Sequence, residues 1–349
     1  MTRTSRVLIA DDSTTIRRAF SALLAEEAGI EVVGEAVDGM DAVEKASRLA
    51  PDVITMDVRM PGMDGLDAIE RIMESSPCRI LVVSSVADDR SLDLSFLAMS
   101  RGALEVIAKP SGNADLRAFG RRLGESIRLM SEVPVVRRRG RSTRTTESAI
   151  TARVDAWGIA ASTGGPPVLA SILAEMPADL RVPVFIAQHM AEGFGAGLVR
   201  WLDGETPLRV VIASDGLSAQ KGTVYLAPDG RDLVVQRDGR IETPRSPGGH
   251  CPSGDRLLRS LSTSYASRAG GVVLTGMGED GARGLLAIRA VGGLTFAQDE
   301  ASSVVFGMPR AARDLDATRE LLPPLAIARA IVESATARTN SSNPPPERR

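Results

Sequence analysis

Short apolar runs alternate with longer stretches of helical periodicity through the first 130 residues, and this alternation restricts the fold more than any other feature. The runs occupy residues 7–10, 32–33, 53–56, 80–83 and 106–107. Continuous apolar runs of this length are typical of strands that are buried on both faces. Between them, apolar residues recur at helical spacing, as at Ile16, Phe20 and Leu23. The pattern predicts five βα units that form a doubly wound, five-stranded parallel sheet.

Residues 154–338 repeat the α/β alternation with different motifs. Strands are expected at 156–160, 184–188, 210–213, 224–227, 271–274 and 295–298, and helices at 168–175, 253–264 and 281–291. Glycine- and proline-rich turns separate these segments. The pattern predicts a second α/β domain of Rossmann-like type. A chain of 349 residues is long enough for two such domains.

The charge of the chain changes sign between the two predicted domains. Residues 1–130 contain 16 Lys or Arg against 21 Asp or Glu, residues 131–153 contain six against two, and residues 154–349 contain 20 against 21. The central stretch has almost no apolar periodicity, so we expect a flexible basic linker at 131–153 between domains at 1–130 and 154–338. The final residues, 339–349, include three consecutive prolines and are expected to be a disordered tail.

Composition narrows the class of protein. Hydrophobic residues make up 43% of the chain and charged residues 25%, as in globular proteins, and the net charge is −2. No apolar run approaches the roughly 20 residues that span a bilayer, and no signal-peptide pattern is present, so we expect a cytoplasmic protein without membrane insertion. The two cysteines, Cys78 and Cys251, fit no zinc-site spacing and are expected to be reduced. Because the only basic cluster lies in the linker, no nucleic-acid partner is expected.

Chemically active side chains follow the predicted strands of the first domain. Asp11 and Asp12 follow the first strand, Asp57 the third, Ser84 the fourth and Lys109 the fifth. Any one of them alone would be interpreted as a helix cap or a turn residue. Because the carboxyl ends of parallel strands share one edge of a sheet, the five are expected to converge. Three carboxylates suit Mg²⁺, and a lysine and a hydroxyl can bind a phosphoryl group on Asp57.

This set closely resembles the phosphorylation site of a response-regulator receiver domain. The resemblance implies that Asp57 accepts the phosphoryl group, that Asp11 and Asp12 hold Mg²⁺ with it, that Ser84 is the switch hydroxyl and that Lys109 binds the phosphate. One residue departs from the pattern. Receivers usually have an aromatic residue three positions before the lysine, and this chain has Val106 there.

The second domain contains a serine in a turn between a predicted strand and a predicted helix. Ser162 lies in the segment Ala161-Ser162-Thr163-Gly164-Gly165, whose small residues permit a sharp turn. Such a turn exposes the hydroxyl at the sheet edge, in front of the free N–H groups of a helix N-terminus. The segment is only loosely related to G-x-S-x-G, because Ala160 replaces the first glycine. A phosphate-binding loop has a similar sequence, and this motif alone favours neither interpretation.

A histidine and an aspartate favour the interpretation of Ser162 as a nucleophile. His189 follows an apolar strand and is predicted to lie at the same sheet edge as Ser162, where it is placed to act as a general base. Asp280, which lies in the segment Thr275-Gly276-Met277-Gly278-Glu279-Asp280-Gly281-Ala282, either caps a helix or orients His189. The Met277 N–H, between two glycines, is a candidate oxyanion-hole donor. The three residues occur in the order serine, histidine, aspartate. This excludes the standard α/β-hydrolase arrangement, in which the order is serine, aspartate, histidine.

These segments together resemble the catalytic domain of the chemotaxis protein-glutamate methylesterases, the CheB family. The matching segments are residues 161–165, 188–190 and 275–282, together with His250-Cys251-Pro252-Ser253-Gly254-Asp255, where Cys251 replaces the usual arginine. The order of receiver, linker and hydrolase matches over nearly the whole chain. The resemblance implies a phosphorylation-activated serine hydrolase that demethylates glutamyl methyl esters on chemoreceptor signalling helices and deamidates glutamines there. A chemotaxis histidine kinase is the implied phosphodonor, and the esterase needs no cofactor.

Two other interpretations predict different behaviour. In one, the second domain is a non-catalytic signalling module. An esterase assay would then detect no activity, whether or not Ser162 is present. In the other, the segment from Ser162 to Gly165 binds a phosphate or a nucleotide, and nucleotides then raise the melting temperature. His250 is interpreted as a structural or substrate-side residue, and Cys251 as a weaker candidate nucleophile, since no second imidazole is assigned to it.

Overall fold

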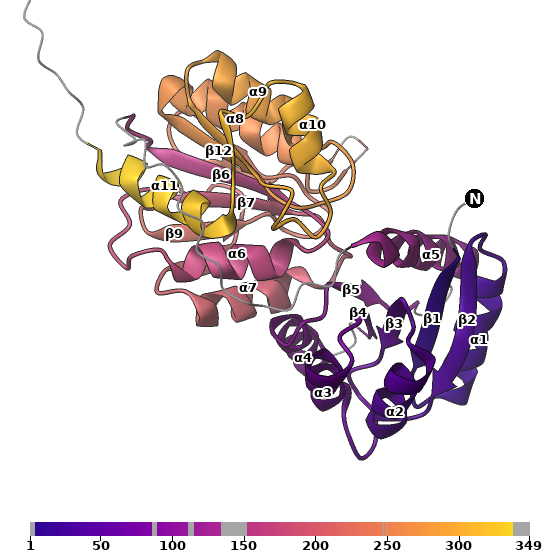
Figure 1. Ribbon diagram of the computed structural model, residues 1–349. Helices are drawn as coiled ribbons and strands as arrows, with labels where there is room; N and C mark the ends of the chain where they lie inside the picture. The colour runs from indigo at the N-terminus through magenta and orange to yellow at the C-terminus, as the bar shows by residue number, and fades with distance from the viewer. Residues whose placement is uncertain are drawn as a thin grey trace, which may run out of the picture.

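The computed structural model describes residues 4–85, 89–110, 115–133, 152–246, 248 and 250–337, and it contains two α/β domains (Figure 1). Most of the predicted linker and the predicted tail at 339–349 lie outside the described residues. Within the described part of the chain, no helix is both long enough and apolar enough to span a bilayer. The two predicted parallel sheets are both present, one in each domain.

The N-terminal domain has a five-stranded parallel sheet with the order β2-β1-β3-β4-β5. Its strands are β1 (Ser5–Ala10), β2 (Ile30–Ala36), β3 (Val53–Met56), β4 (Arg79–Ser84) and β5 (Glu105–Ala108). Its helices are α1 (Thr14–Ala25), α2 (Gly39–Leu49), α3 (Gly65–Ser75), α4 (Asp89–Ser100) and α5 (Leu116–Glu132). Helices α1 and α5 cover one face of the sheet and α2, α3 and α4 the other (Figure 1). The five predicted βα units are thus confirmed.

Short polar side chains begin several of these helices. Ser13 caps α1 by accepting a hydrogen bond from the Ile16 N–H, and Asp64 caps α3 by accepting one from the Asp67 N–H. These caps satisfy backbone donors that have no partner within the helix. The turns that follow β1 and β3 are therefore short, which holds Asp11 and Asp57 close to the sheet edge.

The C-terminal domain has a seven-stranded sheet with the order β14-β13-β12-β6-β7-β9-β8, in which every neighbouring pair is parallel. Its strands are β6 (Ala156–Ala161), β7 (Val184–Gln188), β8 (Arg209–Ile212), β9 (Thr223–Leu226), β12 (Ala269–Val273), β13 (Leu294–Gln298) and β14 (Glu320–Leu322). The strands β10 (Val234–Val235) and β11 (Ile241–Glu242) form a separate hairpin. All six strands predicted from the sequence are present.

Helices cover both faces of this second sheet (Figure 1). They are α6 (Gly165–Ala174), α7 (Gly195–Glu205), α8 (Gly254–Tyr265), α9 (Ala282–Ala290), α10 (Met308–Asp314) and α11 (Pro324–Thr336), with a short 3-10 helix at Ala266–Arg268. Figure 1 shows α8, α9 and α10 on one face and α6, α7 and α11 on the other. The sequence predicted α6, α8 and α9, but not α7, α10, α11, β14 or the hairpin.

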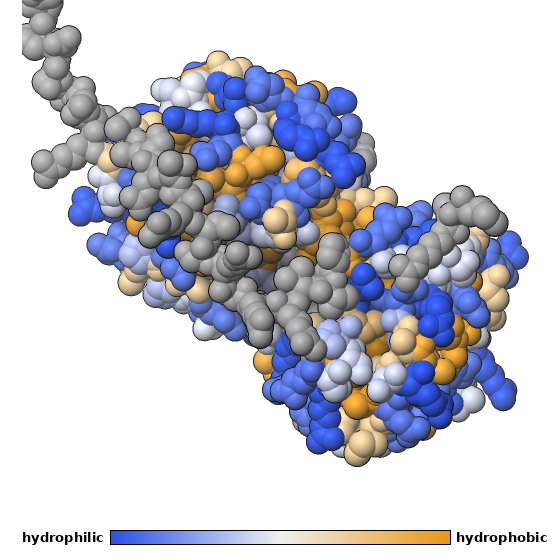
Figure 2. Space-filling view, viewed as in Figure 1, coloured by the Kyte–Doolittle hydropathy of each residue, from blue (hydrophilic) through white to orange (hydrophobic). Residues whose placement is uncertain are grey.

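The two domains meet through α4 and α7. Phe96 of α4 is fully buried, and its ring stacks on Trp201 at a centroid distance of 5.8 Å and meets Phe194 edge-on at 6.2 Å. An ion pair joins Asp93 of α4 to Arg200 of α7 at 2.9 Å. Figure 2 shows apolar side chains gathered where the two domains meet. Burying a large apolar side chain stabilises a contact by about 1.5–3 kcal/mol, so Phe96 is the main apolar anchor of this interface.

Candidate active site

Ser162 lies at the carboxyl edge of the second sheet, in the turn between β6 and α6. Its N–H donates to the Thr275 carbonyl at 3.0 Å, and its own carbonyl accepts from the Gly165 N–H at 2.8 Å. The backbone of the turn is therefore held from both sides. The Ser162 hydroxyl has no hydrogen bond to any described residue. A fixed backbone with an uncommitted hydroxyl is the arrangement that a nucleophile requires.

His189 is placed beside Ser162 by the register of two neighbouring strands. Ala161 of β6 pairs with Gln188 of β7, so the next residues of the two strands, Ser162 and His189, lie side by side. The His189 N–H donates to the Ala161 carbonyl at 2.9 Å, which continues the ladder by one step. The predicted meeting of a serine and a histidine at this edge therefore follows directly from parallel pairing.

Asp280 contacts the imidazole from the other side. Its Oδ2 lies 2.8 Å from Nε2 of His189, and both side chains are largely buried. Burial raises the pKa of Asp280, but the hydrogen bonds from His189 and from backbone N–H groups outweigh it and lower the pKa to about 2. The carboxylate is therefore ionised and can only accept, so Nε2 of His189 donates. Nδ1 remains as the nitrogen that can take a proton from Ser162.

The first turn of α8 holds the Asp280 carboxylate in place. The Gly254 and Asp255 N–H groups donate to it at 2.6 and 3.0 Å, and the Ser253 hydroxyl donates at 3.1 Å. A helix N-terminus stabilises a negative charge through its unpaired N–H groups. Asp280 is therefore not a helix cap but a buried anion, bound jointly by α8 and His189. The signal for this role was the segment from Ser253 to Asp255, which the sequence analysis quoted without assigning it.

Met277 lies in a turn that packs directly against Ser162. A Cβ on the preceding residue, Gly276, would lie 2.6 Å from the Ser162 Cβ, so only glycine permits this approach. The Met277 N–H has no hydrogen-bond partner among the described residues, and its side chain is half exposed. An unpaired N–H beside a nucleophile fits the predicted role of oxyanion donor.

Gln188 is a further site residue that sequence reasoning missed. It is buried, and its Nε2 donates to the Ser162 carbonyl at 2.9 Å and to the His189 carbonyl at 2.8 Å. One side chain therefore joins the backbones of Ser162 and His189. The segment 188–190 matched the family, but no role was assigned to the glutamine, because a glutamine at the end of an apolar strand is also compatible with exposure.

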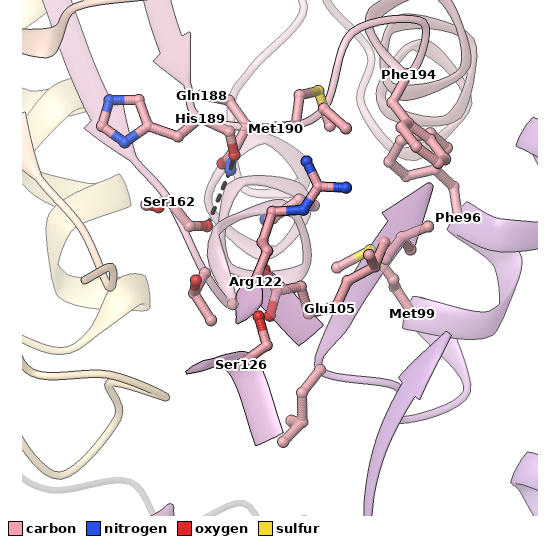
Figure 3. A pocket seen from close by; sticks show the side chains of 17 residues that line it. Phe96, Met99, Glu105, Arg122, Ser126, Ser162, Gln188, His189, Met190 and Phe194 are labelled. Carbon is pink, nitrogen blue, oxygen red and sulfur yellow. Dashed lines mark hydrogen bonds between the residues drawn. The ribbon is translucent and has the colours of Figure 1, made fainter. Parts of the chain in front are cut away.

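A cavity of about 280 Å³ opens beside Ser162 and His189, and residues of both domains line it. The N-terminal domain contributes Phe96, Glu105 and Arg122, and Figure 3 shows Arg122 extending into the cavity. Oε2 of Glu105 is buried and has no hydrogen-bond partner among the described residues. Burial raises the pKa of Glu105 to about 7, although Ser126 and Arg122 partly offset it. The N-terminal domain thus contributes to the cavity beside Ser162 a carboxyl group whose burial favours its neutral form.

The five residues predicted to converge in the N-terminal domain surround one point at its sheet edge. Oxygens of Asp11, Asp12 and Asp57 all lie within 4.8 Å of one another. Nζ of Lys109 lies 2.5 Å from Oδ2 of Asp57 and 2.7 Å from Oδ2 of Asp11. The Ser84 hydroxyl is buried without a hydrogen-bond partner among the described residues. Three hard oxygen donors fit Mg²⁺, and an unpaired hydroxyl beside them fits an incoming phosphoryl oxygen.

The Lys109 ammonium offsets only part of the negative charge that Asp11, Asp12 and Asp57 bring together. Burial raises the pKa of Asp57, against the opposing effect of the Lys109 ammonium. Burial also opposes the charged form of Lys109, but Asp57 and Asp11 outweigh it and raise the pKa of the lysine. Val106, at the position where receivers usually have an aromatic residue, pairs with Val82 of β4 and lines the cavity between the domains.

Comparisons with known proteins identify the family of each domain. The profile described as CheB methylesterase matches residues 157–331, and that of the response regulator receiver domain matches residues 7–119. A "Protein-glutamate methylesterase/protein-glutamine glutaminase 3" of Myxococcus xanthus is 55% identical over 336 residues, which cover 96% of this chain and 95% of that protein. A relative of the same type from Geobacter metallireducens, number 4, is 42% identical over 95% of this chain and 99% of its own length.

One solved structure resembles the C-terminal domain. The crystal structure of the Thermotoga maritima CheB methylesterase catalytic domain is 32% identical, has a TM-score of 0.50, and covers 52% of this chain and 99% of its own.

Proposed function

The chain belongs to the CheB methylesterase family, and we propose that Ser162, His189 and Asp280 are the triad with which it hydrolyses glutamyl methyl esters on chemoreceptors. The observation that supports this most is the contact of His189 with an ionised, buried Asp280, at the strand end that is paired with Ser162. Phosphate binding by the loop from Ser162 to Gly165 would not require a contact between His189 and Asp280. Amide hydrolysis follows the same route, so deamidation of receptor glutamines is proposed as a second reaction of the site.

The reaction is an acyl transfer in two steps. Ser162 Oγ attacks the ester carbonyl while Nδ1 of His189 takes its proton, and Asp280 stabilises the imidazolium. The Met277 N–H binds the oxygen that becomes negative. His189 then protonates the leaving oxygen, and methanol departs from the acyl-enzyme. Water, activated by the same imidazole, releases the glutamate and restores Ser162.

A substitution of Ser162 tests this proposal. Ser162→Ala should abolish methanol release from methyl-labelled receptor while the melting temperature is unchanged. Ser171→Ala is the matched control, because Ser171 lies on α6 and bonds only the Val168 carbonyl of its own helix. Retention of activity in Ser162→Ala would exclude the mechanism, and loss of activity in Ser171→Ala would show that α6 itself is fragile.

The N-terminal domain is proposed to control this activity through phosphorylation of Asp57 by a histidine kinase. Asp11 and Asp12 would hold Mg²⁺ together with Asp57, and the ion would neutralise charge during transfer. Lys109 would then bind the phosphoryl group, and the Ser84 hydroxyl would donate to it. Acetyl phosphate with Mg²⁺ should label the protein, and Asp57→Asn should abolish both labelling and activation. Labelling that persists in Asp57→Asn would exclude this residue.

The cavity suggests how phosphorylation acts. Residues 1–130 are proposed as the receiver and 154–338 as the catalytic domain, joined by a linker at 131–153 and followed by a tail at 339–349. Phe96, Glu105 and Arg122 of the receiver line the same cavity as Ser162, so the docked receiver restricts access to the nucleophile. Phosphorylation would weaken this docking. A shift of only a few kcal/mol is enough to change the docked fraction substantially.

A further inference from the structure

The ring of His250 lies flat against the ring of His189. The two ring centroids are 4.9 Å apart and the planes differ by only 4°. His250 comes from the segment before α8, whereas His189 ends β7, so the two rings are brought together by the tertiary fold alone. His250 is exposed and His189 is largely buried, so the outer ring covers the inner one on its solvent side.

His250 also lies near the turn that contains Met277. Its Nε2 lies 3.8 Å from the position that a Cβ on Gly278 would occupy, and Gly278 follows Met277 directly. A single exposed ring therefore stacks on the proposed base and lies close to the Met277 turn. Among the described residues, no hydrogen bond is formed by the His250 ring, so its contacts at the site are made by its flat face and edge.

The hydrogen bond to Asp280 fixes only part of the His189 geometry. It holds Nε2, but the ring can still tilt about the line from Nε2 to the ring's attachment at Cβ. Such a tilt moves Nδ1 away from the Ser162 hydroxyl. A second flat ring that stacks nearly parallel on the first opposes this motion, because tilting would separate or compress the stacked faces.

We propose that His250 is a positioning residue, whose stacked ring holds the imidazole plane of His189 so that Nδ1 stays directed at Ser162. The inference rests on the triad proposed above. It does not make His250 a second base, because no carboxylate orients its ring among the described residues. The ring is needed for its flat shape, so another aromatic residue should replace it.

Kinetics of the acetyl phosphate-activated, full-length protein test this role. His250→Ala should lower kcat for methyl-ester hydrolysis about three- to tenfold, which corresponds to the strength of a ring pair, and leave KM unchanged. His250→Phe should restore kcat to near the original value. Ser246→Ala, in the same segment, is the matched control and should change neither constant. An increase in KM with unchanged kcat would instead make His250 a substrate contact, and failure of His250→Phe to restore kcat would also overturn the proposal.

A spectroscopic readout separates this inference from the triad itself. The chain has only two histidines, so His250→Phe and His250→Ala each leave a single ring signal, that of His189, in ¹⁵N-histidine-labelled protein. The signal should be sharp in His250→Phe and broadened or shifted in His250→Ala. Equal signals in the two variants would refute the positioning role whether or not Ser162 is the nucleophile. Conversely, activity that survives Ser162→Ala would refute the triad and leave the ring measurement valid.

Discussion

The Ser253 hydroxyl donates to Oδ1 of Asp280 at 3.1 Å and accepts from the Arg256 N–H at 3.3 Å. One side chain therefore begins helix α8 and also binds the carboxylate that orients His189. Two further N–H groups of the same helix turn, from Gly254 and Asp255, donate to this carboxylate. The start of α8 and the position of His189, the proposed base, are thus linked through Asp280.

Replacement of Ser253 should affect stability and catalysis together. Ser253→Ala removes a helix cap and a hydrogen bond to a buried carboxylate, so the free energy of unfolding should fall by about 1–2 kcal/mol and kcat by several-fold. Ser253→Thr keeps the hydroxyl and should retain most of both. Denaturant unfolding and initial rates measure the two effects. Loss of stability without loss of kcat in Ser253→Ala would show that the two N–H groups alone position Asp280.

The raised pKa of Glu105 predicts that receiver docking depends on pH. In the docked structure burial raises this pKa to about 7, and undocking would expose the carboxyl to water and return its pKa towards 4.5. Between those values docked protein would hold a proton that undocked protein has released. Docking is therefore strongest below pH 4.5, weakens as the pH rises to 7 and is weakest above 7. The ratio of basal to acetyl phosphate-activated rate should rise across this window.

Glu105→Gln should remove that pH dependence and lower basal activity above pH 7, because the amide is neutral throughout. Glu125→Gln, on the exposed side of α5, is the control and should behave as the unsubstituted protein. The measurement is the ratio of the basal rate to the acetyl phosphate-activated rate at each pH. Any effect of pH on the triad itself changes both rates equally and cancels in this ratio. A ratio that keeps its slope in Glu105→Gln would assign the effect to another group.

Phe96 should hold the receiver in its docked position. Phe96→Ala removes its stacking on Trp201 and its contact with Phe194, and a loss of about 1.4 kcal/mol of docking free energy would raise the undocked-to-docked ratio tenfold. Basal activity should rise towards the activated level, with labelling by acetyl phosphate unaffected. Leu97→Ala, at an exposed position on the same helix, should leave the basal rate unchanged. A basal rate in Phe96→Ala that stays low would contradict this role.

Lys109 should be needed for the response to phosphorylation more than for phosphorylation itself. Lys109→Ala leaves Asp11, Asp12 and Asp57 in place but removes the ammonium that would bind the phosphoryl group. Labelling by acetyl phosphate should persist while the rise in esterase rate is lost. Lys45→Ala removes an ion pair with Asp41 on α2 and serves as the control. Full activation of Lys109→Ala would reassign the phosphate partner.

Residues that share a strand end could be placed from the sequence. The strands are continuous apolar runs, and parallel pairing brings their carboxyl ends to one edge, which is why the meetings of Asp57 with Lys109 and of Ser162 with His189 were predicted. Helix α7 was missed because its sequence, Gly195-Ala196-Gly197-Leu198 and onward, contains three glycines and reads as a loop. Tertiary packing overrides the low helix propensity of those residues.

Contacts that arise from packing between elements, and not from a shared strand edge, could not be predicted. The stacking of His250 on His189, the bonds of α8 to Asp280 and the contact of Phe96 with Trp201 depend on how elements pack, and no local pattern encodes them. The role of Gln188 was missed for a related reason. It depends on hydrogen bonds to the Ser162 and His189 carbonyls, which only the structure reveals.

Phe96, Glu105 and Arg122 of the receiver line the cavity beside Ser162, so we expect the docked receiver and a receptor helix to exclude each other there. On this proposal the receiver would behave as a tethered competitive inhibitor, whose effective concentration is set by the chain that joins it to the catalytic domain. Competition of this kind raises the apparent KM and leaves the turnover of bound substrate unchanged. Phosphorylation would then act chiefly on KM for the receptor, and a densely packed receptor array would partly activate the enzyme by its local concentration alone.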